Sequence, residues 1–253
     1  MIGIAVITGL LVGLREVKKS GQDADLYFNF FFIVVVACII GARIYYVIFS
    51  WDEYKNDLLK IFAIREGGLA IYGVVIAAAV TAIIYNRIKK YSFPLFTDTG
   101  VFGLIIGQAI GRYGNFTNRE AFGGYTNSLF AMQYRTDTVP WYDKKLVEPL
   151  VTYMDATYIQ VHPTFFYESM WNICLFIALQ FYKKHKAFDG EIFLMYLGGY
   201  GLGRLWIEGL RTDQLKLFGT GIPVSQLLSG LLVAFSIGMI IYNRFIKPQT
   251  KRA

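Results

Sequence analysis

Cysteine and histidine are scarce in this chain, which has two of each among its 253 residues. Cys38 and Cys174 both lie inside apolar segments, so the sequence argues against a disulfide framework and against a metal site, and both are expected to be small buried apolar side chains. Charged residues are also few, at 17%. Because 55% of the chain is hydrophobic and 17% is aromatic, it lacks the polar surface of a soluble domain.

Three further absences narrow the class of protein. No small-residue cleavage site follows the first apolar run, and more apolar runs come after it, so this run is not a signal peptide. No internal repeat or low-complexity tract supports an inverted-repeat transporter. The apolar runs also lack a polar face, so we expect a lipid bilayer, not water, as their solvent.

The apolar runs predict an all-α integral membrane protein with seven transmembrane helices. A span needs roughly 17–25 apolar residues. The runs are 2–14, 26–49, 69–85, 95–113, 164–182, 192–206 and 222–242. The first run is short, so we expect its helix to be truncated, with the given chain beginning inside it.

The distribution of charge predicts the orientation. The net charge of +7 comes from short basic clusters between the apolar runs, which membrane topology explains without nucleic acid. The clusters lie at 15–19, 87–90, 183–186 and 244–252, and the segments of mixed sign lie at 52–66 and 213–216. By the positive-inside rule the basic clusters are cytoplasmic, so the N-terminus is outside and the C-terminus is cytoplasmic. Residues 1–253 are expected to form a single transmembrane domain with a small extracytoplasmic cap at about 115–163.

Charged residues inside the predicted spans mark a candidate site, because a charge in a bilayer is costly and usually functional. They are Arg43, Asp98, Arg112, Glu168, Arg204 and Glu208. All but Asp98 lie toward the outer ends of their spans, which predicts one site at that depth. For Arg43 two alternatives stay open, snorkelling to the headgroups and an internal salt bridge.

Two arginines lie on polar helix faces flanked by glycines. The first face carries Gln108, Arg112 and Asn115, and the second carries Tyr200, Arg204, Glu208 and Arg211. A guanidinium matches phosphate oxygens and stays charged when partly buried, so the predicted ligand is a lipid phosphate. The alternative is that both arginines pair with Glu120, Glu168 or Glu208 and only stabilise the bundle.

A polar run at the end of the fourth predicted span carries a family resemblance. From Gly111 the sequence reads GRYGNFTNREAFGG, which resembles the signature of the prolipoprotein diacylglyceryl transferase family. The positions in register are Arg112, Gly114, Asn115, Phe116, Asn118, Glu120 and Gly123. The resemblance continues through GARIYYVIF, EGGLAIYG, HPTFFYE, YGLGRLWIEGLR and SQLLS, and so covers nearly the whole chain.

The resemblance implies a reaction, partners and a location. A member of this family transfers the diacylglyceryl group of phosphatidylglycerol to the lipobox cysteine of a prolipoprotein signal peptide, so that a thioether forms and glycerol phosphate leaves. No metal or organic cofactor is implied, and the family implies a multi-pass protein of the bacterial cytoplasmic (inner) membrane. The alternative function is a transporter or channel for an anionic lipid or solute, and a weaker alternative is a structural membrane subunit.

The family pattern also implies roles for residues. The expected catalytic residues are Arg112, Arg204, Tyr72, Glu120 and His162. The expected substrate-binding residues are Asn115, Gly123, Asn118, Tyr200, Glu208, Arg211, Arg43 and Gln108. Of these, the phosphate-handling arginines of the family fall on Arg112 and Arg204, in agreement with the two helix faces.

Two departures leave the base of the reaction open. Tyr72 stands where many members have a histidine, and a phenol with a pKa of about 10 is a poor base near neutrality, so Tyr72 is expected to orient substrate. An Arg-Trp-Tyr-Gly-like stretch that usually precedes the first span is absent from the given sequence. His162 and Glu120 are the other candidate bases, and His162 has a structural alternative as part of a His-Pro helix cap.

Overall fold

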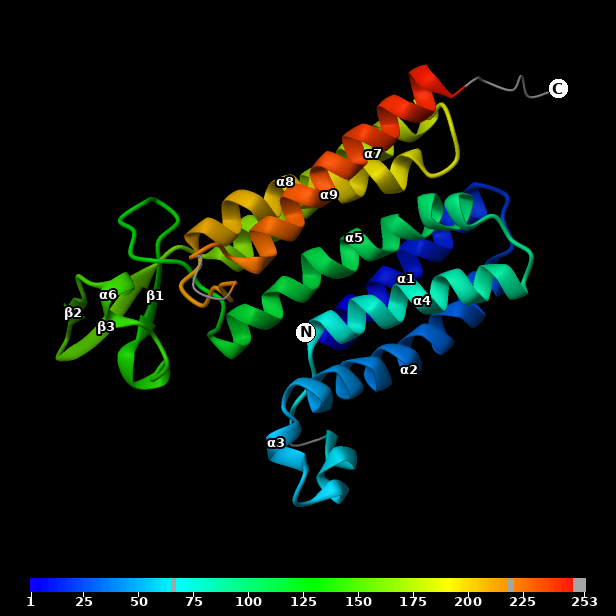
Figure 1. Cartoon of the computed structure of the whole chain (residues 1–253). Coiled ribbons are helices and arrows are strands. Elements are labelled where there is room, and N and C mark those ends of the chain that lie inside the picture. The colour runs from blue at the N-terminus through cyan, green and yellow to red at the C-terminus, as the bar shows by residue number, and fades with distance from the viewer. Residues whose placement is uncertain (65–66, 218–220, 248–253) are drawn as a thin grey trace. The chain divides into compact units, whose positions relative to one another are not determined.

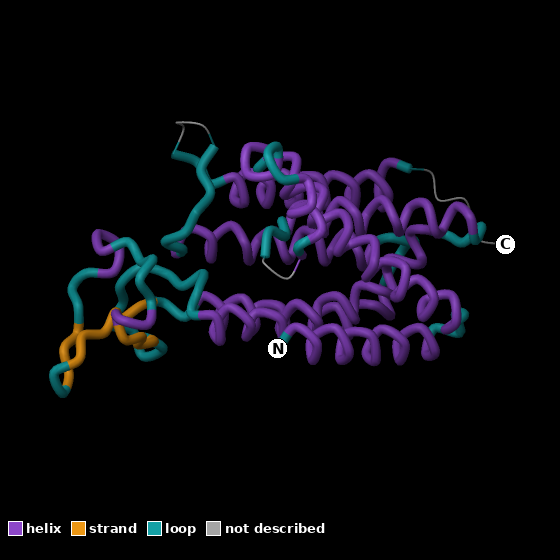
Figure 2. Tube along the Cα trace, turned by 90° about the horizontal axis from the view of Figure 1, so that it is seen from below, coloured by secondary structure: helices purple, strands orange, loops and turns teal. Residues whose placement is uncertain are grey.

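The computed structural model describes residues 1–64, 67–217 and 221–247. It is mostly helical (Figures 1 and 2) and divides into two compact units, one of Met1–Gly13 with Val101–Ala253 and the other of Leu14–Gly100. Helices α1 (Ile2–Lys19) and α5 (Phe93–Asn118) each pass from one unit to the other.

The unit Leu14–Gly100 is built on helices α2 (Ala24–Phe49) and α4 (Ile71–Ile88). These helices cross closely at Gly41 and Gly73, where a Cβ atom added to Gly73 would lie 2.3 Å from the carbonyl oxygen of Gly41. Glycine is required here because any side chain would force the helices apart. The short helix α3 (Trp51–Tyr54) and the 3₁₀ helix η1 (Leu58–Phe62) lie in the connection between α2 and α4.

The other unit packs α7 (Thr164–Tyr182), α8 (Glu191–Leu210) and α9 (Val224–Ile241) with its parts of α5 and α1. The 3₁₀ turn η4 (Lys183–His185) follows α7, and the π-helical turn η5 (Tyr242–Ile246) follows α9. The core consists of Val101, Phe102, Ile105, Leu179, Ile192 and Tyr196. A Cβ on Gly201 would lie 2.9 Å from the Ser229 carbonyl oxygen, so α8 and α9 also cross at a glycine.

A small antiparallel sheet lies between α5 and α7 in the sequence. Its order is β1 (Met132–Arg135), β3 (Ala156–Val161) and β2 (Val151–Tyr153), with Met132 opposite Val161. The turn η3 (Thr136–Thr138) and helix α6 (Lys144–Val147) complete this region. Its own core is formed by Phe122, Tyr134, Val139, Val147, Ile159 and Val161. The expectation of an all-α chain missed this sheet, which lies within the residues of the predicted cap.

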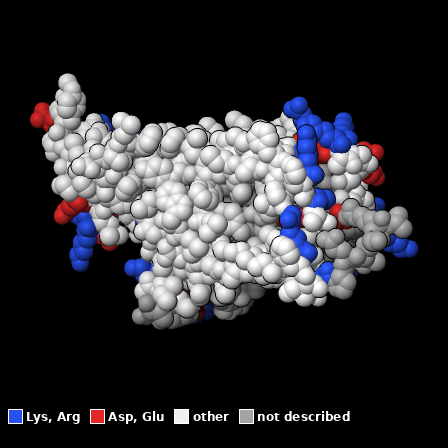
Figure 3. Space-filling view, turned by 90° about the horizontal axis from the view of Figure 1, so that it is seen from above, with Lys and Arg blue, Asp and Glu red and all other residues white. Residues whose placement is uncertain are grey.

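Among the described residues, four helices are long and apolar enough to cross a membrane: Ala24–Phe49, Ile71–Ile88, Phe93–Asn118 and Val224–Ile246. The runs predicted at 2–14, 164–182 and 192–206 also form helices, α1, α7 and α8. Helix α1 is 18 residues long and continues through the basic cluster to Lys19. On the face in Figure 3, charged side chains gather near the helix ends and uncharged residues cover the surface between them.

Candidate functional site

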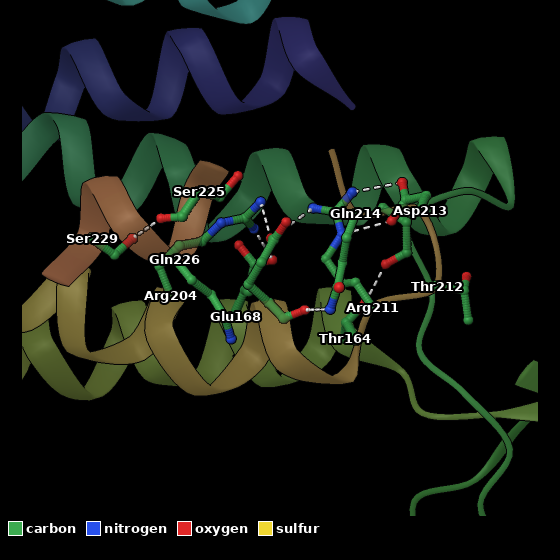
Figure 4. A network of polar contacts seen from close by, with 12 residues as sticks. Thr164, Glu168, Arg204, Arg211, Thr212, Asp213, Gln214, Ser225, Gln226 and Ser229 are labelled. Atoms are coloured by element: carbon green, nitrogen blue, oxygen red, sulfur yellow. Dashed lines mark hydrogen bonds and ion pairs between the residues drawn. The ribbon is translucent and has the colours of Figure 1, made fainter. Parts of the chain in front are cut away.

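Glu168 lies between the two arginines that the helix faces predicted. Its Oε2 is 2.7 Å from Nε of Arg112 on α5, and its Oε1 is 2.6 Å from Nη1 of Arg204 on α8. Glu168 itself is on α7 and only 5% exposed. One carboxylate therefore joins three helices, and Figure 4 shows Glu168 and Arg204 pointing toward each other from α7 and α8.

A second set of ion pairs extends the network along α8 and past its end. Arg204 Nη2 lies 2.6 Å from Glu208 Oε2, and Arg211 Nη1 lies 3.9 Å from the same oxygen. Arg211 also donates to both carboxylate oxygens of Asp213, at 2.9 and 2.7 Å. The Arg204–Glu208 pair follows from the i, i+4 spacing on α8, and Arg211, the first residue after α8, reaches back to Glu208 three residues earlier.

The network is balanced in charge. Its guanidinium groups are those of Arg112, Arg204 and Arg211, and its carboxylates are those of Glu168, Glu208 and Asp213. Burial by itself raises the pKa of the Asp213 carboxyl. The hydrogen bonds and the charge of Arg211 lower it by a larger amount, so this pKa lies below its usual range. Pairing of this kind offsets the cost of removing the charged groups from water.

The polar face of α5 contacts two tyrosines of α8. Arg112 Nη2 donates to Tyr200 Oη at 3.2 Å, and Gln108 Nε2 donates to Tyr196 Oη at 2.8 Å. The spacing of Gln108 and Arg112 predicts that they share one helix face. In the structure this face contacts Tyr196 and Tyr200, which lie one turn apart on α8. The predicted residues Gln108, Arg112, Tyr200, Arg204, Glu208 and Arg211 are all brought together.

A small, partly open cavity lies beside the ion pairs. It is lined by Glu168, Trp171, Asn172, Tyr200, Gly203, Arg204 and Ile207. Drug-sized ligands occupy pockets of roughly 300–1,000 Å³. In this structure the cavity has room for about one water, and not for a whole lipid headgroup.

Glu120 is held by the amides of the same signature run. Asn115 Nδ2 and Asn118 Nδ2 each donate to its Oε1 at 3.1 Å. Residues Arg119 and Ala121 on either side have left-handed backbones, with φ of 56° each, so the chain turns sharply after α5. In the described part of the chain Glu120 makes no ion pair with Arg112 or Arg204. Of the three carboxylates expected as alternative partners of the arginines, Glu168 and Glu208 form such pairs.

Gly123 and His162 join the sheet region to the end of α8. Their backbones pair through the Gly123 amide and the His162 carbonyl at 3.0 Å, and Gly123 also bridges to Arg211. A Cβ on Gly123 would lie 2.7 Å from the His162 Cβ and 2.9 Å from the Leu210 carbonyl oxygen. His162 Nδ1 is 3.2 Å from Tyr167 Oη, and burial lowers the pKa of the imidazole.

Arg43 and Tyr72 lie in the unit Leu14–Gly100. Arg43 is 6% exposed and donates to four backbone carbonyls, those of Lys60, Ile61, Gly67 and Gly68. Its guanidinium therefore ties the connection between α2 and α4 to α2, an arrangement that neither alternative for Arg43 anticipated. Tyr72 is the second residue of α4, and the centre of its ring lies 6.2 Å from the centre of the Tyr45 ring. Glu66, the first residue of the EGGLAIYG run, lies outside the described residues.

Two features of the site have no distinct signal in the sequence. Glu168 is one of three carboxylates that the sequence offers as partners of the arginines, and nothing singles it out, because its partners on α5 and α8 are distant in sequence. Asn172 carries no charge and belongs to none of the motifs, so the sequence does not mark it. It is neutral, 1% exposed and part of the cavity wall.

Comparisons with known proteins agree over nearly the whole chain. A family model described as prolipoprotein diacylglyceryl transferase matches residues 1–242. A phosphatidylglycerol–prolipoprotein diacylglyceryl transferase of Listeria innocua is 45% identical over 246 residues, which cover 96% of this chain and 84% of that protein. Proteins of the same name from Oceanobacillus iheyensis and Clostridium botulinum are 40% identical over 96% of this chain, and 82% and 91% of their own lengths are covered.

Proposed function

Because this chain belongs to the prolipoprotein diacylglyceryl transferase family, we propose that it transfers the diacylglyceryl group of phosphatidylglycerol to the thiol of a prolipoprotein lipobox cysteine. The resemblance seen in the sequence motifs is confirmed by the family match and by these relatives. Their names state the lipid donor, the protein acceptor and the transferred group.

In the proposed reaction the cysteine thiolate attacks the glycerol carbon that carries the phosphate ester. A carbon–sulfur bond forms, the carbon–oxygen bond to phosphate breaks, and glycerol phosphate leaves with the electron pair. The thiol proton goes to a base. The enzyme must therefore supply a base, hold the carbon in line with the sulfur, and stabilise charge on the leaving phosphate.

The main support for the proposal is that Arg112 and Arg204 each form an ion pair with a different oxygen of the Glu168 carboxylate. A carboxylate and two oxygens of a phosphate present similar acceptors to guanidinium groups. Glu168 therefore holds the two arginines at a separation that suits a bridging oxyanion. Each guanidinium has five N–H donors, and the ion pairs and hydrogen bonds among the described residues engage two nitrogens of each. The remaining donors can meet the lipid phosphate.

Two candidate bases lie in the same unit as the arginines. Asn115 and Asn118 fix one oxygen of Glu120 and leave the other to accept a proton. His162 has a lowered pKa because it is partly buried, so its imidazole is neutral near pH 7 and can also accept a proton. Tyr72, in the other unit, is proposed to orient substrate.

The proposal includes a membrane topology. Helices α1, α7 and α8 cross the bilayer together with the four helices that meet the span criterion, and the basic clusters lie on the cytoplasmic side. The sheet region is then an extracytoplasmic cap on the bacterial cytoplasmic membrane, with the N-terminus outside. Labelling of single cysteines placed at residues 128 and 187 from either side of sealed cells tests this orientation, because only the first should react from outside.

The activity is tested with purified protein in phosphatidylglycerol vesicles and a lipobox peptide whose cysteine is free. A mass gain of one diacylglyceryl group on the peptide is expected, and none on a peptide with alanine at that position. The Listeria innocua relative serves as the reference. Transfer by the relative but not by this protein would overturn the proposal, and movement of lipid across the vesicle without peptide modification would favour a transporter.

A further inference from the structure

One polar side chain of the cavity takes no part in the ion-pair network. Asn172 lies on α7 one helical turn after Glu168, on the same face. It is 1% exposed, and its Nδ2 has no hydrogen-bond partner among the described residues. A buried amide donor without a partner is unfavourable and is rare in native proteins, so the position calls for a partner that enters from the cavity.

Trp171, the residue before Asn172, packs α7 closely against α8. The indole Nε1 of Trp171 donates to the Gly199 carbonyl at 2.8 Å. A Cβ on Gly203 would lie 2.3 Å from that indole nitrogen, so Gly203 provides the space that Trp171 fills on α8. Within this packing, Asn172 Nδ2 meets no acceptor among the described residues.

The depth of Asn172 points to a particular part of a lipid. With a rise of 1.5 Å per residue, Asn172 lies about 6 Å further along α7 than Glu168, toward the middle of the helix. In a glycerophospholipid the two acyl ester groups lie on the hydrocarbon side of the phosphate. If the phosphate is bound at the level of Arg112 and Arg204, the ester carbonyls reach the level of Asn172.

The chemistry of the amide matches that assignment. The arginines beside the cavity are already paired with carboxylates, and Asn172 adds a neutral donor to this charge-balanced wall. An ester carbonyl is a neutral acceptor without a donor of its own, and so complements an N–H group.

We propose that Asn172 donates a hydrogen bond through Nδ2 to an acyl ester carbonyl of the lipid, and so positions the diacylglyceryl group that is transferred. This inference rests on the proposed function. It assigns Asn172 to binding of the transferred group, while the arginines bind the leaving phosphate.

The test compares two lipids and two proteins. Transfer to the lipobox peptide is measured with diacyl phosphatidylglycerol and with a dialkyl ether analogue of equal chain length, which has no carbonyl acceptors. Wild-type protein is expected to favour the diacyl lipid in kcat/KM by roughly two- to tenfold, the worth of one hydrogen bond. Asn172→Leu, which keeps the volume and removes the donor, is expected to use both lipids equally and to match the wild type on the ether lipid.

A matched control comes from the same unit. Ser236 on α9 is also 1% exposed, and its hydroxyl has no hydrogen-bond partner in the described part of the chain, but it does not line the cavity. Ser236→Ala should keep the wild-type preference for the diacyl lipid. Asn172→Ala serves as a second variant if the leucine is not accommodated.

The outcomes are distinct. Equal use of the two lipids by the wild type would overturn the role of Asn172 without any variant. An undiminished preference for the diacyl lipid in Asn172→Leu or Asn172→Ala would do the same. Absence of transfer from either lipid by the wild type would contradict the proposed function instead.

Discussion

Glu168 Oε1 and Arg204 Nη1 are 2.6 Å apart, and the two side chains are only 6% and 14% exposed. Breaking a buried ion pair from one side leaves a charge without compensation and costs about 3–5 kcal/mol. Because Glu168 also pairs with Arg112, we expect Glu168→Gln to lower the free energy of unfolding by about that amount. Denaturation of the protein in detergent micelles measures this change.

An exposed ion pair of the sheet region provides the control for this substitution. Arg135 and Asp137 lie 2.8 Å apart, with both side chains more than half exposed. Asp137→Asn should change the free energy of unfolding by less than about 1 kcal/mol, since solvent screens such pairs. Equal effects of Glu168→Gln and Asp137→Asn would contradict a structural role for the buried carboxylate.

Loss of either predicted phosphate ligand should abolish catalysis. We expect Arg112→Ala and Arg204→Ala to lower kcat/KM for phosphatidylglycerol by at least roughly 10²–10³-fold, the range for removing a donor to a developing oxyanion. Lysine at either position should rescue little, because an ammonium does not provide a planar fork of donors. Arg135→Ala is the control, because Arg135 is an exposed arginine of the sheet region, and it should retain full transfer. Normal transfer by both Arg112→Ala and Arg204→Ala would exclude a phosphate-binding role, provided that membrane insertion is shown by the cysteine labelling assay.

Gly123 offers a steric test of the junction between the sheet region and α8. A Cβ at this position would lie 2.7 Å from the His162 Cβ, so Gly123→Ala must displace His162 or the end of α8. We expect a loss of about 1–3 kcal/mol in stability, together with lower activity, because Arg211 bridges to Gly123. Gly238→Ala in α9, where a Cβ would meet nothing within 4 Å, should leave stability equal or raise it by up to about 1 kcal/mol. A neutral Gly123→Ala would show that the junction is loose.

The helices and the arginine pair were accessible from the sequence because both depend on local spacing. Apolar runs located every long helix, and the spacing of Gln108, Arg112 and Asn115 predicted a common face. Helix α1 extends beyond its apolar run because Arg15, Lys18 and Lys19 are good helix formers whose charged ends can leave the bilayer. The sequence could not indicate which carboxylate would separate the arginines, because Glu120, Glu168 and Glu208 all lie at compatible positions.

Other features depend on contacts that leave no pattern in a single sequence. The strands of the sheet are three to six residues long, and their pairing joins residues 132 and 161 across a long connection. The partners of Arg43 are backbone carbonyls, which every residue possesses, so no residue type identifies them. The cavity beside Asn172 arises only when α7 and α8 are packed.

His162 links activity and stability to pH in a defined direction. Burial lowers the pKa of its imidazole below the ordinary value of 6.5, so the unfolded chain binds a proton more readily than the folded protein does. Stability is then fully present above about pH 6.5 and falls as the pH is lowered from there toward the folded-state pKa. We expect His162→Gln to reduce the slope of the melting temperature between pH 7.5 and pH 5, measured in the same micelles.

The same variant distinguishes the two candidate bases. If His162 takes the thiol proton, kcat/KM in the wild type declines on the acid side with a pKa below 6.5, and His162→Gln loses most of the activity at all pH values. Glu120→Gln would then retain a similar acid limb. If Glu120 is the base, His162→Gln instead keeps most of its transfer activity, and only its pH-dependent stability changes. The hydrogen bond between Tyr167 Oη and His162 Nδ1 makes Tyr167→Phe the matched positioning variant, which should alter the acid side of the pH profile only in the first case.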